Sequence, residues 1–454
     1  MFTYQDLLAV GQSDKERMDF VKKAIAQHKS SGIYQMAFDA QQYLEHKNVT
    51  INAYRKLLYT VTGKAVPDNW SANFKMASRF FYRFVTQENQ FLLGNGVTWG
   101  DTKTKDSLGT KKVSFDTQLQ EIGKNALTHG VAFGFFNLDH VDSFSLLEFV
   151  PLYDEEDGSL KAGIRFWQID DGKPLRATLY ELDGYTDYIW KNTKKDGEIL
   201  NDKRAYKLKL KGTDAEGVQI YDGENYPSFP IIPMWGNQEH QSELVGLREQ
   251  IDCYDLIKSG FANTVDEASI VYWTLTNAGG MDDVDLAKFA ERMKTVHAVK
   301  MDDAVQVDSH TVDVPYESRE SLLKRLEDDL YKDAMALNTG NIASGSYSVT
   351  ATQIEAAYEP LNAKTDGFEY CVDQFIDAIL EIAGIEDEYS FTRSYIVNKS
   401  EEITSVIQAA SYLDSEYVTK KILTIMGDGD KAEDVLKNME YDDISRFNNA
   451  QNEG

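Results

Sequence analysis

The chain has 454 residues, and its 74 acidic against 47 basic side chains give it a formal net charge of −27. This charge excludes a basic DNA-reading domain, while 42% hydrophobic residues and only 8 prolines exclude a disordered chain. At roughly 100–200 residues per domain, the length fits two to four domains or one elongated chain of several parts.

The cysteines and the N-terminus bear on the cellular compartment. Cys253 and Cys371 lie far apart and outside any CxxC spacing, so we expect two buried thiols rather than a disulfide framework or a zinc module. Residues 1–6 lack the pattern of a signal peptide, and no run approaches the ~18 apolar residues of a membrane span. The sequence therefore predicts a soluble intracellular product in a reducing compartment, without membrane contact.

The first part of the chain has helical patterns. A helix is predicted from about Ser13 to Lys47, and Ser13 with Glu16 forms a capping-box pattern at its start. A second helix, from about Ala72 to Leu93, has a broad aromatic face. A third, from about Asp116 to Thr128, precedes Gly130, which suits a left-handed C-cap.

From Val131 onward, alternating and aromatic runs predict strands. Asp-Gly pairs, which favour type I′ hairpin turns, recur about every dozen residues at Asp157-Gly158, Asp171-Gly172, Asp183-Gly184 and Asp196-Gly197. This spacing predicts an antiparallel β-meander. The meander closes at residues 227–233, where three prolines exclude a central strand or a helix.

The second half of the chain contains long helices. The first is predicted from about Ser242 to Glu267, which corresponds to about 39 Å at 1.5 Å per residue, with an apolar stripe along it. A compact α/β segment follows, with a strand at 270–276, a turn at 279–280, a helix at 284–299 and strands around 305–314. A second long helix is predicted from about Ser318 to Leu337.

A polar, glycine-containing run at 338–349 predicts a flexible loop. The helix after it runs from Thr350 to about Ala383, with a capping-box pattern at its start and an expected kink at Pro360. From Ser400 to the end, the pattern is that of short, acid-rich helices with a break at 427–429.

Motifs for catalysis are missing from the sequence. It contains no P-loop, no GxGxxG after a strand and no GxSxG, and its seven histidines never form HxxxH or HxH. The acidic cluster at 154–158 is expected to be a solvated hairpin turn. We interpret Asp282, Asp283 and Asp285, and likewise Asp428 and Asp430, as loop or helix N-terminal charge rather than metal ligands. We therefore expect no enzymatic activity, no cofactor and no metal.

Several short segments stand in a characteristic order. They are Phe91 to Gly96, Gly130 to Gly134, the IP-hydrophobic-x-x-N pattern from Ile232 to Asn237, Ser242-Glu243-Leu244, Ile251-Asp252, Tyr254-Asp255, and the Ser344-Gly345 loop before the helix at Thr350. With the order of elements, they resemble the portal proteins of tailed double-stranded DNA bacteriophages, most closely those of long-tailed siphoviruses that infect Gram-positive bacteria. The resemblance covers nearly the whole chain, although the tail after Ser400 matches only in being helical.

The resemblance implies an α+β portal-protein fold and a ring-forming oligomer, usually of twelve copies. Its parts would be a wing (1–241; helical N-terminus and β-meander), a first stem helix (242–267), a small α/β clip (268–316), a second stem helix (317–337), a tunnel loop (338–349), a long kinked wing helix with the return to the crown (350–399), and a mainly helical crown (400–454).

The resemblance also implies site residues. Tunnel-loop residues that contact DNA would be Asn338, Thr339, Asn341, Ile342, Ser344, Gly345, Ser346 and Tyr347. Stem cations that face DNA would be Arg248, Lys258, Lys324, Arg325 and Lys332, although ion pairs on their own helix, such as Lys332 with Asp328, explain them equally well. Clip residues that contact the motor and the adaptor would be Asp282, Asp283, Lys288, Arg292 and Lys294.

The implied function is a channel at the portal vertex of the virion for DNA packaging and ejection, after assembly in the bacterial cytoplasm. The implied partners are double-stranded DNA, the terminase large subunit, the head-completion adaptor, and the major capsid and scaffolding proteins. Because the negative chain repels phosphates, DNA contacts should be transient and independent of sequence. The alternatives are another oligomeric virion component, such as an adaptor or baseplate-like protein without a channel, and a metal-dependent hydrolase built on the acidic clusters.

Overall fold

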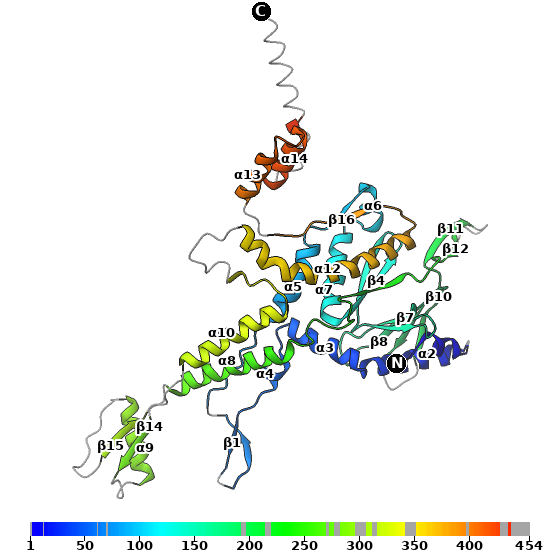
Figure 1. Ribbon diagram of the computed structural model, residues 1–454. Coiled ribbons are helices and arrows are strands. Elements are labelled where there is room, and N and C mark those ends of the chain that lie inside the picture. Colours follow the sequence, from blue (N-terminus) through cyan, green and yellow to red (C-terminus); the bar gives the residue numbers. More distant parts are fainter. Residues whose placement is uncertain are drawn as a thin grey trace, which may run out of the picture.

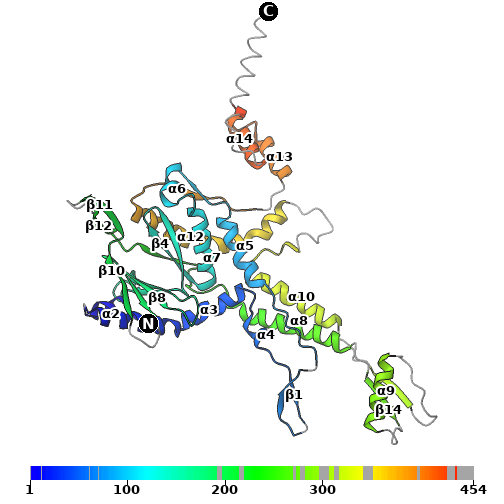
Figure 2. The same ribbon diagram turned by 180° about the vertical axis from the view of Figure 1, so that it is seen from behind.

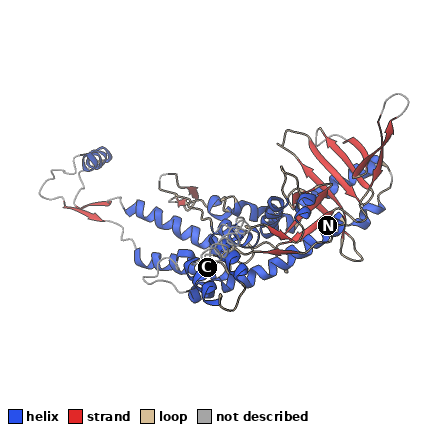
Figure 3. Ribbon diagram, turned by 90° about the horizontal axis from the view of Figure 1, so that it is seen from above, coloured by secondary structure: helices blue, strands red, loops and turns tan. Residues whose placement is uncertain are grey.

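The structure is a computed structural model that describes residues 2–11, 13–60, 62–69, 71–191, 197–213, 219–268, 272–276, 282–295, 306–310, 316–340, 351–395, 399–426 and 435–436. The molecule is elongated: a pair of long helices leaves a mixed α/β body and leads to a small α/β unit, and two shorter helices lie on the opposite side (Figure 1). Seen from above, the larger sheets gather at one end and the long helices extend from the other toward the strand pair of the small α/β unit (Figure 3). Within the described ranges, no helix combines the length and apolar composition that crossing a membrane requires.

The helices of the body are α1 (Tyr4–Ala9), α2 (Asp14–Lys29), α3 (Gly32–Leu44), α4 (Val49–Ala53), α5 (Phe80–Leu93), α6 (Thr102–Leu108), α7 (Phe115–His129) and α12 (Ala351–Ala383). The others are α8 (Arg248–Ala268), α9 (Asp283–Thr295), α10 (Tyr316–Asp333), α13 (Lys399–Ala409) and α14 (Ser415–Met426).

The strands up to the end of the meander are β1 (Leu57–Tyr59), β2 (Ala65–Pro67), β3 (Val97–Trp99), β4 (Val131–Asn137), β5 (His140–Ser145), β6 (Phe149–Tyr153), β7 (Leu160–Trp167), β8 (Leu175–Glu181), β9 (Gly184–Trp190) and β10 (Glu198–Arg204). They are followed by β11 (Lys207–Thr213), β12 (Gln219–Glu224), β13 (Ile231–Trp235), β14 (Tyr272–Thr276), β15 (Gln306–His310) and β16 (Tyr389–Phe391). The mixture of helices and sheets confirms the predicted fold class.

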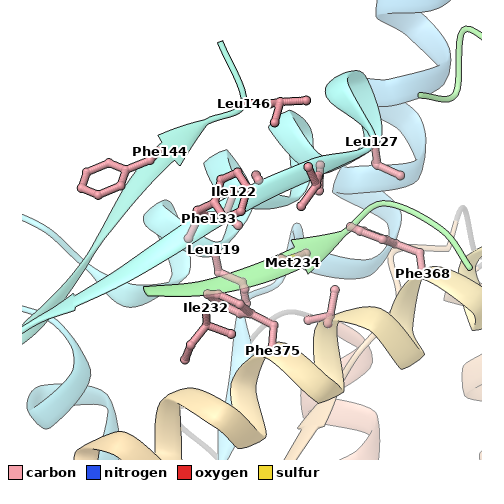
Figure 4. Packing of buried hydrophobic residues seen from close by; sticks show 14 of the residues in the cluster. Leu119, Ile122, Leu127, Phe133, Phe144, Leu146, Ile232, Met234, Phe368 and Phe375 are labelled. Atoms are coloured by element: carbon pink, nitrogen blue, oxygen red, sulfur yellow. The ribbon is translucent and has the colours of Figure 1, made fainter. Parts of the chain in front are cut away.

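The main core of the body surrounds a three-stranded antiparallel sheet of order β13-β4-β5 (Figure 4). Helix α7 packs against β4 and β5, and α12 packs against β13. Phe375 of α12 lies so close to Gly134 of β4 that a Cβ atom there would be 2.4 Å from its ring. The third predicted helix is confirmed as α7, and Gly130 follows it with a φ of 88°. Strand β13 contains Pro233 but lies at the sheet edge, where a missing N–H donor is tolerated.

The predicted β-meander is confirmed as a five-stranded antiparallel sheet of order β10-β9-β8-β7-β6. Its first two turns contain Asp157-Gly158 and Asp171-Gly172. The third turn contains Asp183, and Gly184 begins β9, whereas Asp196 lies outside the described residues. Apolar side chains of α1 and α2 cover one face of the sheet and form a second core with it. The acidic cluster at 154–158 is the expected hairpin turn, and Glu155 there accepts a hydrogen bond from Thr3 at 2.7 Å.

The helix predicted from Ser13 to Lys47 is in fact two helices, α2 and α3. Serine side chains satisfy backbone groups locally and so favour helix boundaries. Accordingly, Ser31 caps α3 by accepting a hydrogen bond from the Tyr34 amide at 3.2 Å. Ser13 precedes α2 as predicted, but its side chain forms no capping hydrogen bond.

The aromatic helix predicted from Ala72 begins only at Phe80, as α5. Residues 73–79 form no helix, because the backbone amides of Phe74, Met76 and Ser78 bond to side chains of α8 instead. The predicted end at Leu93 is confirmed.

Both long helices are shorter than predicted. Gly246 has a φ of 86°, which is not a helical conformation, so α8 begins at Arg248 rather than at Ser242. Its 21 residues span about 32 Å. At the end of α10, Met335 has a φ of 52° and keeps the helix from reaching Leu337.

The small α/β unit has the predicted order of strand, helix and strand. Strands β14 and β15 pair antiparallel, and α9 lies between them in the chain. The turn predicted at 279–280 lies outside the described residues. So do Thr350, with its capping-box pattern, and the break at 427–429. Helix α12 continues through Pro360, and α13 and α14 confirm short helices after residue 398.

The two cysteines differ in exposure. Cys371 is buried as expected, but Cys253 is exposed, which corrects the prediction of two buried thiols. Cys253 lies about 200° around α8 from the buried side chain of Ile251, and therefore on the opposite face of the helix.

Candidate functional site: the stem and the base of the loop

Helices α8 and α10 form an antiparallel pair that we call the stem (Figure 2). Near the body, the rings of Tyr254 on α8 and Tyr331 on α10 both contact Phe80 of α5, with centroids 5.0 and 6.2 Å away. At the outer end, next to the small α/β unit, the rings of Phe261 and Tyr316 lie 5.8 Å apart. Aromatic contacts therefore hold the stem together at both ends.

One face of α8 is buried although it is polar. It bonds to the extended residues 73–79, which we call the strap. Three alternate strap amides donate to side chains at every fourth residue of α8: Ser78 to Asp255 at 2.8 Å, Met76 to Ser259 at 2.9 Å, and Phe74 to Asn263 at 2.7 Å. The side chain of Asn48 also donates to Asp255. Burial raises the pKa of Asp255, whose carboxyl group is held by hydrogen-bond donors and has no ion pair with a cation among the described residues.

The apolar stripe predicted on α8 is only partly covered. Ile251 is buried against the body, whereas Val265 near the outer end is 52% exposed. Leu322 on α10 is 45% exposed. A single chain therefore leaves large apolar side chains in the outer half of its stem in contact with solvent.

The two predicted cations on α8 have partners within the chain. Arg248 pairs with Asp39 at 2.7 Å, and its guanidinium lies 5.7 Å from the centroid of the Tyr43 ring. Lys258 is half-buried, and its ammonium lies 5.6 Å from the centroid of the Tyr254 ring. These contacts favour a structural role for Arg248, and contact of either residue with DNA stays a prediction.

The three predicted cations on α10, Lys324, Arg325 and Lys332, are exposed. Arg325 and Lys332 approach Asp329 at 3.8 and 3.9 Å, so the acidic partner of Lys332 is Asp329 rather than Asp328. Exposed pairs of this kind contribute only ~0.2–1 kcal/mol. Either cation can therefore exchange its carboxylate for a phosphate at little cost, and contact with DNA stays a prediction for all three.

The stem leads into the predicted tunnel loop, of which residues 338–340 are described. Asn338 accepts a hydrogen bond from the amide of Gly340 at 3.1 Å, and Thr339 is exposed. The other predicted loop residues, Asn341, Ile342, Ser344, Gly345, Ser346 and Tyr347, lie outside the described residues. Of the predicted loop, the structure therefore describes the base, residues 338–340.

Helix α5 holds the chain on both sides of this loop. The side-chain amide of Gln87 donates to the carbonyl of Leu337 at 3.1 Å and accepts from its N–H at 2.9 Å. One turn further on, Phe91 forms a buried cluster with Leu337 and with Tyr358 and Leu361 of α12. The residue before the loop and the helix after it are thus fixed to the same element.

Replacing Gln87 with alanine should loosen this attachment. The substitution removes both hydrogen bonds to Leu337, so we expect a loss of about 1–2 kcal/mol in the free energy of unfolding and faster hydrogen exchange at the Leu337 amide. Gln90→Ala is the matched control, because Gln90 lies on the same helix but is exposed. Equal exchange rates at Leu337 in the wild type and in Gln87→Ala would contradict the role.

Lys364 of α12 joins α5 to the segments just before α8 and just after α10. Its ammonium lies 2.8 Å from the carboxylate of Glu88 and 2.7 Å from that of Glu243, and it donates to the carbonyl of Ala334 at 3.3 Å. Asn237, the last residue of the IP-hydrophobic-x-x-N pattern, donates to the same Glu243 at 2.7 Å. Segments of α5, the turn before α8, the end of α10 and α12 therefore meet at one charged group.

This cluster contains one cation and two carboxylates. Glu88 is 2% exposed, whereas Glu243 and Lys364 are each 14% exposed and line a cleft of about 680 Å³. Burial raises the pKa of Glu88 to about 7, although Lys364 opposes this effect. Burial lowers the pKa of Lys364, but attraction to both carboxylates outweighs it and raises that pKa overall. Lys364 therefore stays charged, and Glu88 is the group that takes up a proton near neutral pH.

The stability of the protein should depend on pH through Glu88. Because its pKa is about 7 in the folded chain and about 4.5 when unfolded, its contribution is fully present below pH 4.5 and is lost as the pH rises through 7. At about 1.4 kcal/mol per pKa unit, the loss is about 3 kcal/mol. Chemical denaturation at pH 5 and pH 8 should show most of this loss in the wild type and none of it in Glu88→Gln.

A matched control is Glu239→Gln, which changes an exposed residue in the wall of the same cleft and should leave the wild-type pH dependence in place. An identical pH dependence in the wild type and in Glu88→Gln would refute the assignment of the proton to Glu88.

The predicted clip residues lie at the outer end of the molecule. The carboxylate of Asp282 accepts hydrogen bonds from the amides of Val284 and Asp285, each at 2.9 Å, so it caps α9 as expected. Asp283, Lys288 and Arg292 are exposed on α9, and Lys294 lies on the same helix with its side chain outside the description. Contact of these residues with a motor or an adaptor stays a prediction.

Sequence reasoning missed the strap, Gln87 and Lys364. A signal for the strap was present, since Asp255, Ser259 and Asn263 repeat at the spacing of one helix face. No comparable signal exists for Gln87 or Lys364, whose neighbours in sequence are ordinary helix residues.

Three comparisons with known proteins bear on identity. Residues 24–443 match the family model described as phage portal protein, SPP1 Gp6-like. The chain is 24% identical over 385 residues to the portal protein of Bacillus phage SPP1, a match that covers 80% of this chain and 75% of that one. It is 25% identical over 288 residues to the portal protein of Clostridium phage phiCD119, covering 60% of each chain.

Among solved structures, a chain from the neck of an empty gene transfer agent particle has a TM-score of 0.45 at 10% identity, covering 77% of this chain and 90% of that chain. A chain from the virion of a native gene transfer agent particle has a TM-score of 0.43, also at 10% identity and with the same coverage. The sequence matches confirm the resemblance inferred from the order of the segments. The chain belongs to the SPP1 Gp6-like family of phage portal proteins.

Proposed function

We propose that this chain forms a ring of twelve copies at the portal vertex of a phage capsid. The stem of each copy would line a channel for the packaging and ejection of double-stranded DNA. The main support is the uncovered stem. A pair of helices that leaves the body with Val265 and Leu322 exposed needs neighbours to cover its faces. A closed ring of copies supplies such neighbours all around the channel.

The proposal gives each part a role. We place the wing at 1–241, the stem helices at 242–267 and 317–337 with the clip between them, the tunnel loop at 338–349, the long wing helix and return at 350–399, and the crown at 400–454. The clip would contact the terminase large subunit and later the head-completion adaptor. The wing would contact neighbouring subunits and the major capsid and scaffolding proteins. The chain itself would have no catalytic activity.

The attachment of the loop supports its part in this proposal. Residues that contact moving DNA need a fixed support, and Gln87, Phe91 and Lys364 provide one on both sides of the loop. The net charge of −27 per copy repels the phosphate backbone, so DNA would slide through the channel rather than stick to it.

Electron microscopy of the purified protein, with light scattering for mass, tests the proposal. We expect rings with an open pore as wide as a DNA duplex. A solid assembly or a compact dimer would instead favour the adaptor or baseplate-like alternative. In phage particles, deleting residues 344–346 should leave the rings intact but reduce the DNA packaged per head, and normal packaging would exclude the loop from DNA contact.

A further inference from the structure

The cleft where the stem joins the body carries an excess of negative charge. The ionisable side chains that line it are Glu88, Glu239, Glu243, Asp333 and Lys364. Lys364 is shared between Glu88 and Glu243, while Glu239 and Asp333 are exposed. Among the described residues, four acids therefore face one cation in a cleft of about 680 Å³, which leaves both charge and room for a further cationic side chain.

The exposed face of α5 has the opposite charge. Residues 71–87 contain three cations and no acidic side chain, in a chain with a net charge of −27. Arg79, Tyr82 and Arg83 are all exposed, and the Arg79 guanidinium lies 4.5 Å from the centroid of the Tyr82 ring. Arg83 donates to the hydroxyl of Tyr331 at 3.4 Å. Neither arginine forms an ion pair with a carboxylate in the part of the chain that the structure describes, so both charges remain available.

The cleft and this arginine face lie on opposite sides of the same two helices. On α5, Glu88 lies about 170° around the helix from the midpoint between Tyr82 and Arg83. On α10, Asp333 lies about 200° around the helix from Tyr331, the residue that Arg83 contacts. Two helices therefore place the arginines on one flank of the molecule and the cleft on the other.

The two surfaces also lie at the same level, where the stem joins the body (Figures 1 and 2). Arg83 and Glu88 are five residues apart on α5, which corresponds to about 7.5 Å along the helix. A ring of identical copies joins two different surfaces of each copy, and rotation about the ring axis preserves height along it. The arginine face of one copy and the cleft of the next therefore meet the conditions for a head-to-tail contact.

We propose that Arg79 and Arg83 of one subunit occupy the cleft of a neighbouring copy, where the exposed carboxylates of Glu239 and Asp333 receive them. This inference rests on the proposed ring. The planar guanidinium presents several N–H donors in a fixed fork that matches a carboxylate, so arginine suits such a site better than lysine does. The contact brings two more cations to the cleft, and the neighbouring copy thus completes a site that a single chain leaves with excess acid.

Disulfide trapping tests the contact directly. Val245 is 49% exposed in the wall of the cleft, and the Tyr82 ring of the neighbouring copy would pack against it. In a Cys253→Ser background, Tyr82→Cys with Val245→Cys should give a ladder of cross-linked subunits after mild oxidation with copper phenanthroline. Tyr82→Cys with Leu208→Cys is the control, because Leu208 is more exposed but lies on β11 of the body. A link within one subunit, or no link in assembled rings, would overturn the proposal.

A charge swap tests the ion pairs. Arg83→Glu should raise the protein concentration needed for half-maximal ring assembly by about tenfold or more, because like charges then meet in the cleft. Adding Glu239→Arg should bring that concentration back to within about threefold of the wild type. Lys23→Glu, the same change of charge at an exposed position of α2, should assemble like the wild type. A double variant that assembles no better than Arg83→Glu would contradict the pairing.

The same measurements separate this inference from the proposed function. If the wild type forms no rings, both the proposed function and the arginine contact fail. If rings form and Arg83→Glu assembles like the wild type, only the arginine contact fails, and a loss of packaged DNA in such rings would assign Arg83 to DNA instead. The melting temperature of the unassembled chain should be the same in the wild type and in Arg83→Glu, because Arg83 is exposed.

Discussion

Replacing Lys364 with methionine is expected to lower the free energy of unfolding by about 3–5 kcal/mol. The change removes the cation that lies between Glu88 and Glu243 and leaves two carboxylates facing each other in a largely buried site. It also removes the hydrogen bond to Ala334, so the residue that follows α10 loses one of the contacts that hold this segment to α12. The loss should therefore affect the stem as well as the body.

Urea denaturation at one protein concentration measures this effect, because the stability of an assembling protein depends on concentration. Lys324→Met, which removes an exposed lysine from the stem, should stay within about 0.5 kcal/mol of the wild type. Adding Glu88→Leu to Lys364→Met should recover much of the loss, because it removes the more deeply buried of the two carboxylates. A single variant as stable as the wild type would mean that the cluster does not hold these segments together.

Replacing Asp255 with alanine is expected to cost about 2–4 kcal/mol, because the amide of Ser78 and the side chain of Asn48 both lose their buried acceptor. Asp255→Asn should cost far less. It keeps an oxygen for Ser78 and removes a buried negative charge. The Oδ1 atom of Asn48, which is buried without a hydrogen-bond partner, can accept from the new amide once the Asn48 side chain turns over, although Asn48 then gives up its 3.2 Å hydrogen bond to the carbonyl of Ser78.

Hydrogen exchange at single amides gives the sharpest measurement of this effect. Asp255→Ala should accelerate exchange most at Ser78 and less at Met76 and Phe74, whose acceptors remain. Glu249→Ala, at an exposed position of the same helix, should change none of the three. Unchanged exchange at Ser78 in the alanine variant would show that the strap does not depend on this carboxylate.

Local patterns predicted the elements that are stabilised by local structure. Helix α7 with its glycine cap and the meander with its Asp-Gly turns follow from residues close in the chain. The start of α5 could not be predicted in this way, because residues 73–79 suit a helix by composition. Their amides are bound by side chains of α8, which lie almost two hundred residues later in the sequence.

The stem and the loop base show the same limit. Periodicity predicted both long helices. The start of α8 and the end of α10, however, are each set by one residue with a positive φ angle, Gly246 and Met335. The predicted stem cations were chosen by charge alone, and the fold engages Arg248 with the body. Lys364 and Gln87 became visible only when four distant segments were brought together, since no spacing in the sequence marks either residue.

The strap also couples the dimensions of two segments. Two residues of extended chain advance by about 6.6 Å, and four residues of helix advance by about 6 Å. Because the two distances are nearly equal, every second strap amide lies opposite every fourth residue of α8 over the three observed bonds. The mismatch of about 0.6 Å per step would carry a much longer contact out of hydrogen-bonding range. A stem lengthened by one turn within this stretch would need two more strap residues, so the lengths of the two segments are tied by a fixed ratio.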